Sequence, residues 1–489
     1  MKSTLDKFDI LIKGGRIIDG TGSPSFKADI AINGEYIFQI GALNVENPEH
    51  VIDATNHVIA PGFIDVHTHD DRLLLSNPEV TPKLSQGVTT VVVGNCGASL
   101  SPWTSNFPPP PPLDLIIPME NNSYRFPTFS SYAIALENKP ASVNSLSLIG
   151  HSTLRCGAVK DLERPASVQE IKKMKQLLRE SLISGAGGFS TGLFYKPNKP
   201  APPSEVEALA SELKAFKAVY STHMRNEADK LLDSLDETFE TAKLAGCPVV
   251  ISHHKCQGKD NWGKSKVSLK RIENAHKHQQ ISFDVYPYVA GSTVLLEEMI
   301  SQSYKIIVTW SKSVPEAKGR ELTDIANEWD VSLEEAMRNL QPGGGIYFSM
   351  KDEDVERILS HPLAMIGSDG IPHDEHPHPR LWGTFPRVLG YYTREKKLFD
   401  LETAVHKMTG IPSKNFNLHK RGTLKDGSFA DIVIFDPDTI RDCASFENPT
   451  ETSDGVNTVI VNGTIAWSNG TGTGSRTGHL LKNEFCNKN

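Results

Sequence analysis

Short runs in which apolar and polar positions alternate occupy both ends of the chain. Near the N-terminus they cover residues 9–19 and 28–37, and near the C-terminus residues 422–436 and 458–467. A period of two predicts β-strands, and the Gly-Gly and Asn-Gly pairs among these runs predict tight turns between antiparallel strands. We therefore expect one small β-sandwich domain that is assembled from both ends of the chain.

Between these ends, apolar runs with the length of strands alternate with segments of helical periodicity. In residues 204–214 and 228–242, for example, apolar residues recur at steps of three and four, which predicts amphipathic helices. The eight expected strands are residues 63–67, 88–93, 146–150, 187–190, 218–223, 248–253, 281–286 and 364–368. Successive strand–helix units predict an α/β fold with a closed, TIM-like (β/α)8 barrel rather than an open sheet.

Two segments interrupt the barrel pattern. Residues 101–127 contain five consecutive prolines at 108–112, which cannot lie in a helix or a central strand and predict a long loop after the second strand. Residues 294–351 are too long for a simple connection and include an expected helix at 331–340, so we expect an inserted subdomain that overhangs the barrel mouth. The expected domains are a β-sandwich of residues 1–60 and 415–480 and a catalytic barrel of residues 61–414 that contains this insertion.

Potential metal ligands follow several of the expected barrel strands. On a strand, residues i and i+2 point to the same face, so His67 and His69 can present two imidazoles to one point. The other candidates follow strands two, five, six and eight: Cys96, His223, His253 and Asp369. A lone histidine at a strand end is usually structural, but catalytic groups of α/β barrels collect at the carboxyl ends of the strands. Six zinc-competent side chains at one end therefore predict a metal site.

Some of these residues have an alternative interpretation. Cys96 could pack as a small apolar side chain, although a thiolate is a strong zinc ligand that could bridge two metals. Asp369 could take a proton from an activated water and pass it to a leaving amine, or could serve only as an oxygen ligand. Asp70 and Asp71 could orient the rings of the two histidines beside them, or could be loop charges.

Composition narrows the class of protein. The formal net charge is -8, and no Lys/Arg-rich run occurs, which argues against nucleic acid as a partner. The N-terminus lacks the apolar region of a signal peptide, and no apolar run is long enough to span a membrane. The 6 cysteines form no CxxC pair, which favours a reducing compartment. We expect a cytoplasmic protein that acts on a small molecule, and its oligomeric state stays open.

The same residues resemble a known family. The Gly-Phe-Ile-Asp-x-His-x-His strand, the later histidines, Ser368-Asp369 and the C-terminal Gly-Ser-Phe-Ala-Asp-Ile-Val-Ile-Phe-Asp are similar to the amidohydrolase superfamily. Longer segments narrow the resemblance to the D-aminoacylases, which are zinc-dependent N-acyl-D-amino-acid deacylases: residues 94–97, 188–195, 284–293, 368–374 and 378–390. After strand four no lysine occurs before Lys196, which argues against a hydantoinase or dihydroorotase with a carboxylated lysine. The resemblance covers nearly the whole chain, but the proline-rich segment is not part of it.

The resemblance implies roles for individual residues. It implies a tight zinc site at Cys96, His223 and His253, and a weaker site at His67, His69 and Asp369 with Cys96 as the bridge. It also implies that Asp369 is the catalytic acid/base. The residues implied to hold the free carboxylate of the substrate are Lys255, Tyr286, Ser292 and Arg380. Those implied to surround the amino-acid side chain are Phe194, Tyr195, Tyr347 and Met350.

The implied activity is hydrolysis of the linear amide of an N-acyl-D-amino acid to a D-amino acid and a carboxylate. Residues 291–296 offer no cation for a second carboxylate, which favours neutral or hydrophobic side chains. An alternative is an N-acyl-D-glutamate or D-aspartate deacylase, or another amidohydrolase that acts on cyclic amides. A different class of function is a catalytically inactive barrel that serves as an assembly subunit, although that case predicts the loss of metal ligands.

Overall fold

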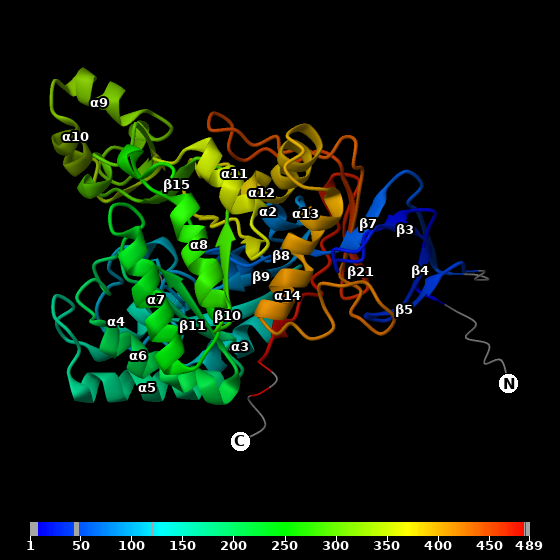
Figure 1. The fold of residues 1–489 in the computed structure, drawn as a ribbon, viewed down its shortest axis with the longest axis horizontal. Helices are drawn as coiled ribbons and strands as arrows, with labels where there is room; N and C mark the ends of the chain where they lie inside the picture. The colour runs from blue at the N-terminus through cyan, green and yellow to red at the C-terminus, as the bar shows by residue number, and fades with distance from the viewer. Residues whose placement is uncertain (1–7, 44–47, 119–121, 484, 486–489) are drawn as a thin grey trace.

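A parallel barrel forms the centre of the computed structural model, which describes residues 8–43, 48–118, 122–483 and 485 (Figure 1). In spatial order its strands are β8 (Phe63–Asp65), β9 (Val88–Val93), β10 (Asn144–Gly150), β11 (Gly188–Gly192), β12 (Val219–His223), β13 (Val249–Ile251), β14 (Ile281–Val285) and β18 (Ala364–Ile366). The sheet nearly closes beyond β8 and β18, because Thr68 bridges Gly370 and the N–H of Asp369 donates to the carbonyl of His67. The predicted (β/α)8 barrel is thereby confirmed.

Amphipathic helices cover the outside of the barrel. The longest, α5 (Val168–Ile183), starts with a capping box between Ser167 and Glu170 and buries Met174, Leu178 and Leu182 on one face. The other helices that flank barrel strands are α1 (Leu73–Ser76), α2 (Thr81–Leu84), α3 (Phe129–Asn138), α4 (His151–Ala158), α6 (Pro203–Ala210), α7 (Leu231–Ala245), α8 (Ser265–His276), α11 (Asp352–Ser360), α12 (Arg380–Arg387), α13 (Leu401–Met408) and α14 (Gly410–Asn415). None of the helices in these described ranges has the length and apolar character needed to cross a bilayer.

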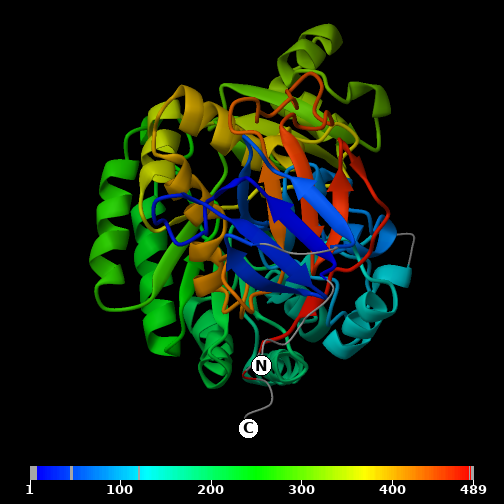
Figure 2. The same cartoon turned by 90° about the vertical axis from the view of Figure 1, so that its right-hand side faces the viewer.

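Strands from the two ends of the chain lie together beside the barrel (Figure 2). One sheet has the order β5 (Tyr36–Gly41), β4 (Asp29–Asn33), β1 (Ile10–Lys13) and β6 (His50–Asp53). The second has the order β22 (Thr471–Gly472), β21 (Thr464–Ser468), β20 (Val456–Val461), β19 (Ile432–Phe435), β7 (Val58–Pro61), β2 (Arg16–Ile17) and β3 (Phe26–Lys27). N-terminal β7 pairs directly with C-terminal β19. Alternate apolar residues such as Ile12, Ile59 and Ile434 fill a separate core between the two sheets.

The segment between β14 and β18 carries a small sheet with two helices. The antiparallel strands β15 (Ala290–Val294), β17 (Gly343–Phe348) and β16 (Lys305–Ser311) pair in that order. Helices α9 (Leu322–Trp329) and α10 (Leu333–Asn339) pack on this sheet and project from the molecule at the top left of Figure 1. Strand β15 begins four residues before the insertion predicted from the sequence.

The proline-rich segment after β9 packs against the barrel. It contains the 3-10 helix η1 (Leu113–Leu115), and a second, η2 (Asn122–Tyr124), follows. Leu113, Ile116 and Ile117 are buried in the main core of the barrel. The segment is therefore held in place by its apolar residues.

Candidate metal centre and active site

Six potential ligands converge at the carboxyl end of the barrel strands. One group whose donor atoms lie within 4.8 Å of one another consists of His67, His69, Cys96 and Asp369, and a second consists of Cys96, His223 and His253. Cys96 belongs to both groups, because its Sγ lies 3.2 Å from Nε2 of His67 and 3.4 Å from Nε2 of His253. Imidazole, thiolate and carboxylate donors suit a zinc-like cation, and the shared sulfur could bridge two of them.

Three of these donors lie on backbone with positive φ, which non-glycine residues rarely adopt. The φ angles are 51° for Cys96, 36° for His253 and 49° for Asp369. The turn before Cys96 depends on Gly94, where a Cβ would lie 2.1 Å from the carbonyl oxygen of Leu148. Strained backbone of this kind clusters at functional sites, and here it turns the donors toward the shared centre.

Buried carboxylates hold the histidine rings from behind. Nδ1 of His67 lies 3.2 Å from Asp284, and Nδ1 of His253 lies 3.0 Å from Glu227. Such partners fix the ring orientation and leave Nε2 free to ligate a metal. The orienting role considered for Asp70 therefore falls to Asp284 at the ring of His67. Asp70 is fully buried, so it is not a loop charge either.

The electrostatics of the site favour ionised ligands. Burial alone would raise the pKa of the Cys96 thiol, but His67 and His253 lower it well below its usual value. The thiolate is the form of cysteine that ligates metals. Burial would also raise the pKa of the Asp369 carboxyl, but Arg380 and the two histidines hold it well below its usual value. Asp369 is therefore ionised.

A buried lysine supports the strand end that carries Asp369. Lys83 donates to Asp65 and to Ser368, each at 2.8 Å, and lies 3.5 Å from Asp70. Asp65 in turn accepts from the backbone N–H of Ser368 at 2.8 Å. These contacts tie β8 to the residue before Asp369, so they fix the position of the carboxylate relative to the histidines.

Of the four predicted carboxylate-binding residues, Lys255, Tyr286 and Ser292 line the pocket that contains the candidate metal ligands, and Arg380 is buried next to Tyr286. The guanidinium of Arg380 lies over the ring of Tyr286, 4.6 Å from its centroid, and Nζ of Lys255 lies 5.8 Å from the same centroid. Arg380 also lies 2.9 Å from the carboxylate of Asp369 and donates to the carbonyl of Ser292 at 3.2 Å. Each of the two cations is thus next to a resident carboxylate, Asp369 for Arg380 and Glu227 for Lys255.

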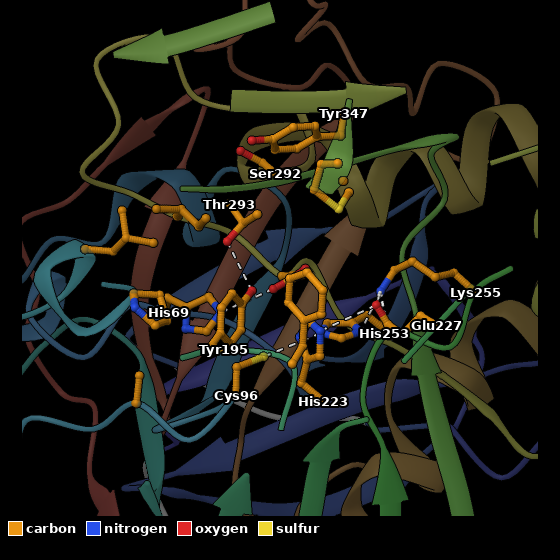
Figure 3. Close-up of a pocket in the computed structure, with 18 of the residues that line it drawn as sticks. His69, Cys96, Tyr195, His223, Glu227, His253, Lys255, Ser292, Thr293 and Tyr347 are labelled. Atoms are coloured by element: carbon orange, nitrogen blue, oxygen red, sulfur yellow. Dashed lines mark hydrogen bonds and ion pairs between the residues drawn. The ribbon is translucent and has the colours of Figure 1, made fainter. Parts of the chain in front are cut away.

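Aromatic side chains also line the pocket (Figure 3). The ring of Phe194 stacks on His223 with centroids 5.6 Å apart, and the hydroxyl of Tyr195 lies 3.1 Å from Thr293. Tyr347 reaches the pocket from β17 of the small sheet. Met350, which the sequence places beside them, lines a separate small cavity behind His253, Lys255 and Tyr286, where it is buried. Met299 lines the main pocket instead.

Several residues of the site have no role assigned from the sequence. Glu227 lies four residues after His223, a spacing that resembles an ordinary helical ion pair, although its position after a barrel strand was an available signal. Asp284 lies in a segment of family resemblance, but the sequence does not show which group its carboxylate meets. Pro112, Leu115 and Ile116 of the proline-rich segment also line the pocket, and no periodicity predicts that approach.

The chain matches a known protein family over most of its length. The model of the Amidohydrolase family matches residues 50–287 and 329–466. The chain is 48% identical to a D-aminoacylase of Alcaligenes xylosoxydans xylosoxydans over 480 residues, which is 98% of this chain and 99% of that relative. The match therefore extends over barrel and terminal strands alike.

Two solved structures resemble the whole molecule. A crystal structure of D-aminoacylase that defines a novel subset of amidohydrolases has a TM-score of 0.95 and 48% sequence identity, and the match covers 97% of this chain and 100% of that one. An N-acyl-D-glutamate deacylase from Bordetella bronchiseptica, complexed with zinc and a phosphonate that mimics the tetrahedral intermediate, has a TM-score of 0.92 and 40% identity, with 97% and 100% coverage.

Proposed function

The chain belongs to the amidohydrolase family, and from this premise we propose that it hydrolyses N-acyl-D-amino acids with the help of zinc. The observation that carries the proposal is the thiolate of Cys96, which belongs to both ligand groups next to an ionised Asp369. Its similarity to a D-aminoacylase and to a zinc-bound N-acyl-D-glutamate deacylase supports this substrate class.

The two donor sets suit two metal positions, and the resemblance to D-aminoacylases implies that the two differ in affinity. Cys96, His223 and His253 would hold the tight zinc, while His67, His69 and Asp369 would hold a weaker one with the shared thiolate. Zinc, when bound, polarises an amide carbonyl and lowers the pKa of water to about 7. The buried partners Asp284 and Glu227 keep the ligand rings of His67 and His253 in their orientation.

Asp369 moves the proton in the proposed reaction. Its ionised carboxylate takes a proton from the attacking water as the new C–O bond forms. The C–N bond then breaks, and Asp369 returns the proton to the departing amine. The products are a carboxylic acid and a free D-amino acid, and water supplies all the added atoms.

Three points of contact would select one hand of the substrate. The acyl carbonyl lies at the metal ligands, the free carboxylate near Arg380 and Lys255, and the side chain toward Phe194 and Tyr347. Guanidinium and ammonium groups are suited to a carboxylate. Both cations lie near the ring of Tyr286, so they are close to each other. The opposite hand would direct the side chain into the barrel wall.

A neutral side chain is the favoured substrate feature. Among the described residues that line the pocket, Lys255 is the one lysine or arginine, and it is already assigned to the first carboxylate. Hydrolysis of N-acetyl-D-methionine, N-acetyl-D-leucine and N-acetyl-D-glutamate tests this preference. A higher kcat/KM for the glutamate derivative would favour the alternative, a deacylase of acidic D-amino acids.

A cytoplasmic location stays a prediction from the cysteine pattern.

The activity itself is tested by one variant and one metal analysis. We expect the purified protein to contain zinc and to hydrolyse N-acetyl-D-methionine but not the L enantiomer. The Asp369→Asn variant should lose about 10²-fold or more in kcat, since proton transfer by a positioned side chain contributes typically 10²–10⁴-fold. Asp374→Asn, a buried carboxylate nearby in sequence, is the matched control. An Asp369→Asn protein with full activity would refute the mechanism, and a zinc-loaded protein without deacylase activity would favour the assembly-subunit alternative.

A further inference from the structure

An apolar wall closes the metal pocket on the side of the proline-rich segment. We call it the acyl wall and define it by Ala98, Pro112, Leu115, Ile116 and Ile371, all of which line the pocket that contains the metal ligands. Leu115 is half-buried and the other four are buried. Their side chains neither carry charge nor form hydrogen bonds. The proposed proton transfer and carboxylate binding use none of them.

The acyl wall lies away from Lys255, one of the carboxylate-binding residues. Figure 3 places Lys255 and Glu227 at one edge of the site and His69 at the opposite edge. Ile371 comes two residues after Asp369, and the carbonyl of the intervening Gly370 accepts from the backbone N–H of His69 at 3.0 Å. At least this part of the acyl wall is therefore beside His69.

The acyl chain and the amine of an amide substrate must extend toward different edges of the site. The amide is planar, so the acyl chain and the amine leave the carbonyl carbon in different directions. If the amino-acid carboxylate lies near Lys255 and Arg380, as in the proposed function on which this inference rests, the acyl chain must extend elsewhere. The acyl wall offers it an apolar surface next to the metal ligands.

A larger groove lies next to the pocket along the same proline-rich segment. Its volume is about 650 Å³, against about 50 Å³ for the metal pocket. Phe194 and Tyr195 line both hollows, and Pro111 lines the groove directly before Pro112 lines the pocket. The groove and the metal pocket are therefore neighbours, with Phe194 and Tyr195 along both.

The chemistry of the groove suits a hydrocarbon chain. Its apolar lining includes Leu162, Pro197, Leu295, Leu296, Trp310 and Pro342. Six charged residues also line it. Lys196 pairs with Glu163 at 2.8 Å, Lys199 with Glu298 at 3.4 Å and Glu297 with Arg338 at 3.0 Å, while burial raises the pKa of Asp114 to about 6. The groove therefore has four carboxylates and two lysines, so it suits an uncharged chain better than an anionic ligand.

We propose that the acyl group of the substrate lies against the acyl wall and that a medium-length straight chain continues into the groove. The enzyme then prefers N-acyl-D-amino acids with fatty acyl groups to N-acetyl compounds. Each methylene that leaves water is worth about fourfold in affinity. Several buried methylenes therefore predict a gain of at least tenfold in kcat/KM from an acetyl to an octanoyl substrate.

Zinc-loaded, full-length protein and three variants test this proposal. N-acetyl-, N-butanoyl- and N-octanoyl-D-methionine are compared in the wild type and in Leu162→Trp, which fills the groove. Leu244→Trp on α7, where Leu244 is 59% exposed, is the matched control. We expect Leu162→Trp to lower kcat/KM for the octanoyl substrate at least tenfold more than for the acetyl substrate, whereas Leu244→Trp keeps the wild-type profile. Leu115→Ser provides a second variant in case Leu162→Trp does not fold, and the same selective loss is expected.

Calorimetric titration with acetate and octanoate separates this inference from the proposed function. We expect octanoate to bind the wild-type protein at least tenfold more tightly than acetate, and this difference to disappear in Leu162→Trp. The inference is overturned if Leu162→Trp and Leu115→Ser keep the wild-type dependence of kcat/KM on acyl-chain length. Hydrolysis of N-acetyl-D-methionine by the same proteins would show that the deacylase activity is intact. Absence of all hydrolysis would overturn the proposed function, and the calorimetric comparison would still decide whether the groove binds acyl chains.

Discussion

The carboxylate of Glu227 lies 3.0 Å from Nδ1 of His253 and receives hydrogen bonds from Lys255 at 2.9 and 2.8 Å. One buried group thus contacts a proposed metal ligand and a proposed substrate-binding residue. Burial would raise the pKa of Glu227, but Lys255 and the neighbouring histidines hold it below its usual value. Glu227 is therefore ionised, and its negative charge interacts with both His253 and Lys255.

We expect Glu227→Gln to weaken metal binding and substrate binding together. The amide keeps the shape of the side chain but loses the charge that orients His253 and pairs with Lys255. Loss of such a partner costs roughly 10–100-fold in metal affinity or activity. Zinc content after dialysis against a graded chelator and KM for N-acetyl-D-methionine provide two readouts. Glu240→Gln, an exposed position on α7, is the control, and wild-type zinc retention in Glu227→Gln would contradict this role.

Arg380 gives a second prediction, because it contacts both Asp369 and the carbonyl of Ser292. Lysine preserves the charge but not the planar fork, so Arg380→Lys can keep at most part of this geometry. We expect KM to rise about tenfold, with a smaller fall in kcat. Arg387→Lys on the same helix, whose side chain pairs with Asp442, tests whether any arginine change on α12 has this effect. Equal kinetics in Arg380→Lys and wild type would exclude a carboxylate-binding role.

The candidate metal ligands could be predicted from the sequence because each one lies at or just after the end of a recognisable barrel strand. His67 and His69 lie one residue apart after an apolar run, and the structure brings both to the same centre as Cys96. The family and the barrel predicted from these motifs are confirmed by the similarity to D-aminoacylase. The partners of the ligands were not predictable in this way, since the contact between Asp284 and His67 joins residues 217 positions apart.

The apolar part of the pocket was harder to predict for a related reason. The resemblance implied that Met350 surrounds the amino-acid side chain of the substrate, yet Met350 lines a different cavity. Met299 and Ile116 reach the pocket from segments without regular periodicity. Side chains on such segments take their direction from tertiary packing, which local sequence patterns do not encode.

Removal of the buried Lys83 should destabilise the protein. Lys83→Met would leave Asp65 and Asp70 buried without their counter-charge, and breaking a buried pair costs about 3–5 kcal/mol. Chemical unfolding followed by circular dichroism measures this loss. Lys243→Met, at a position where the side chain is 70% exposed, should change stability by less than about 0.5 kcal/mol. Equal unfolding midpoints for Lys83→Met and Lys243→Met would show that the contacts of Lys83 contribute nothing to stability.

The final prediction concerns the dependence of stability on pH. Lys407 on α13 is 1% exposed and donates to the carbonyl of His361. Burial lowers its pKa from 10.5 to about 8. Between these two values the unfolded chain holds a proton that the folded protein has lost, so the free energy of unfolding must rise with pH across this window. Below pH 8 Lys407 is protonated in both the folded and the unfolded state, and burial of its charge lowers the free energy of unfolding by about 3 kcal/mol.

Lys407→Met should therefore be more stable than the wild type at pH 7 and should lose the rise in stability between pH 8 and 10.5. The uncharged side chain fills a similar volume and carries no proton to release, although the carbonyl of His361 loses a donor, which offsets part of the gain. Urea unfolding at several pH values, in wild type and in the exposed control Lys414→Met, measures the difference between the curves. Since Lys414→Met removes the same formal charge, a general effect of net charge would appear in both variants. Parallel curves for Lys407→Met and wild type would show that Lys407 titrates alike in the folded and unfolded states.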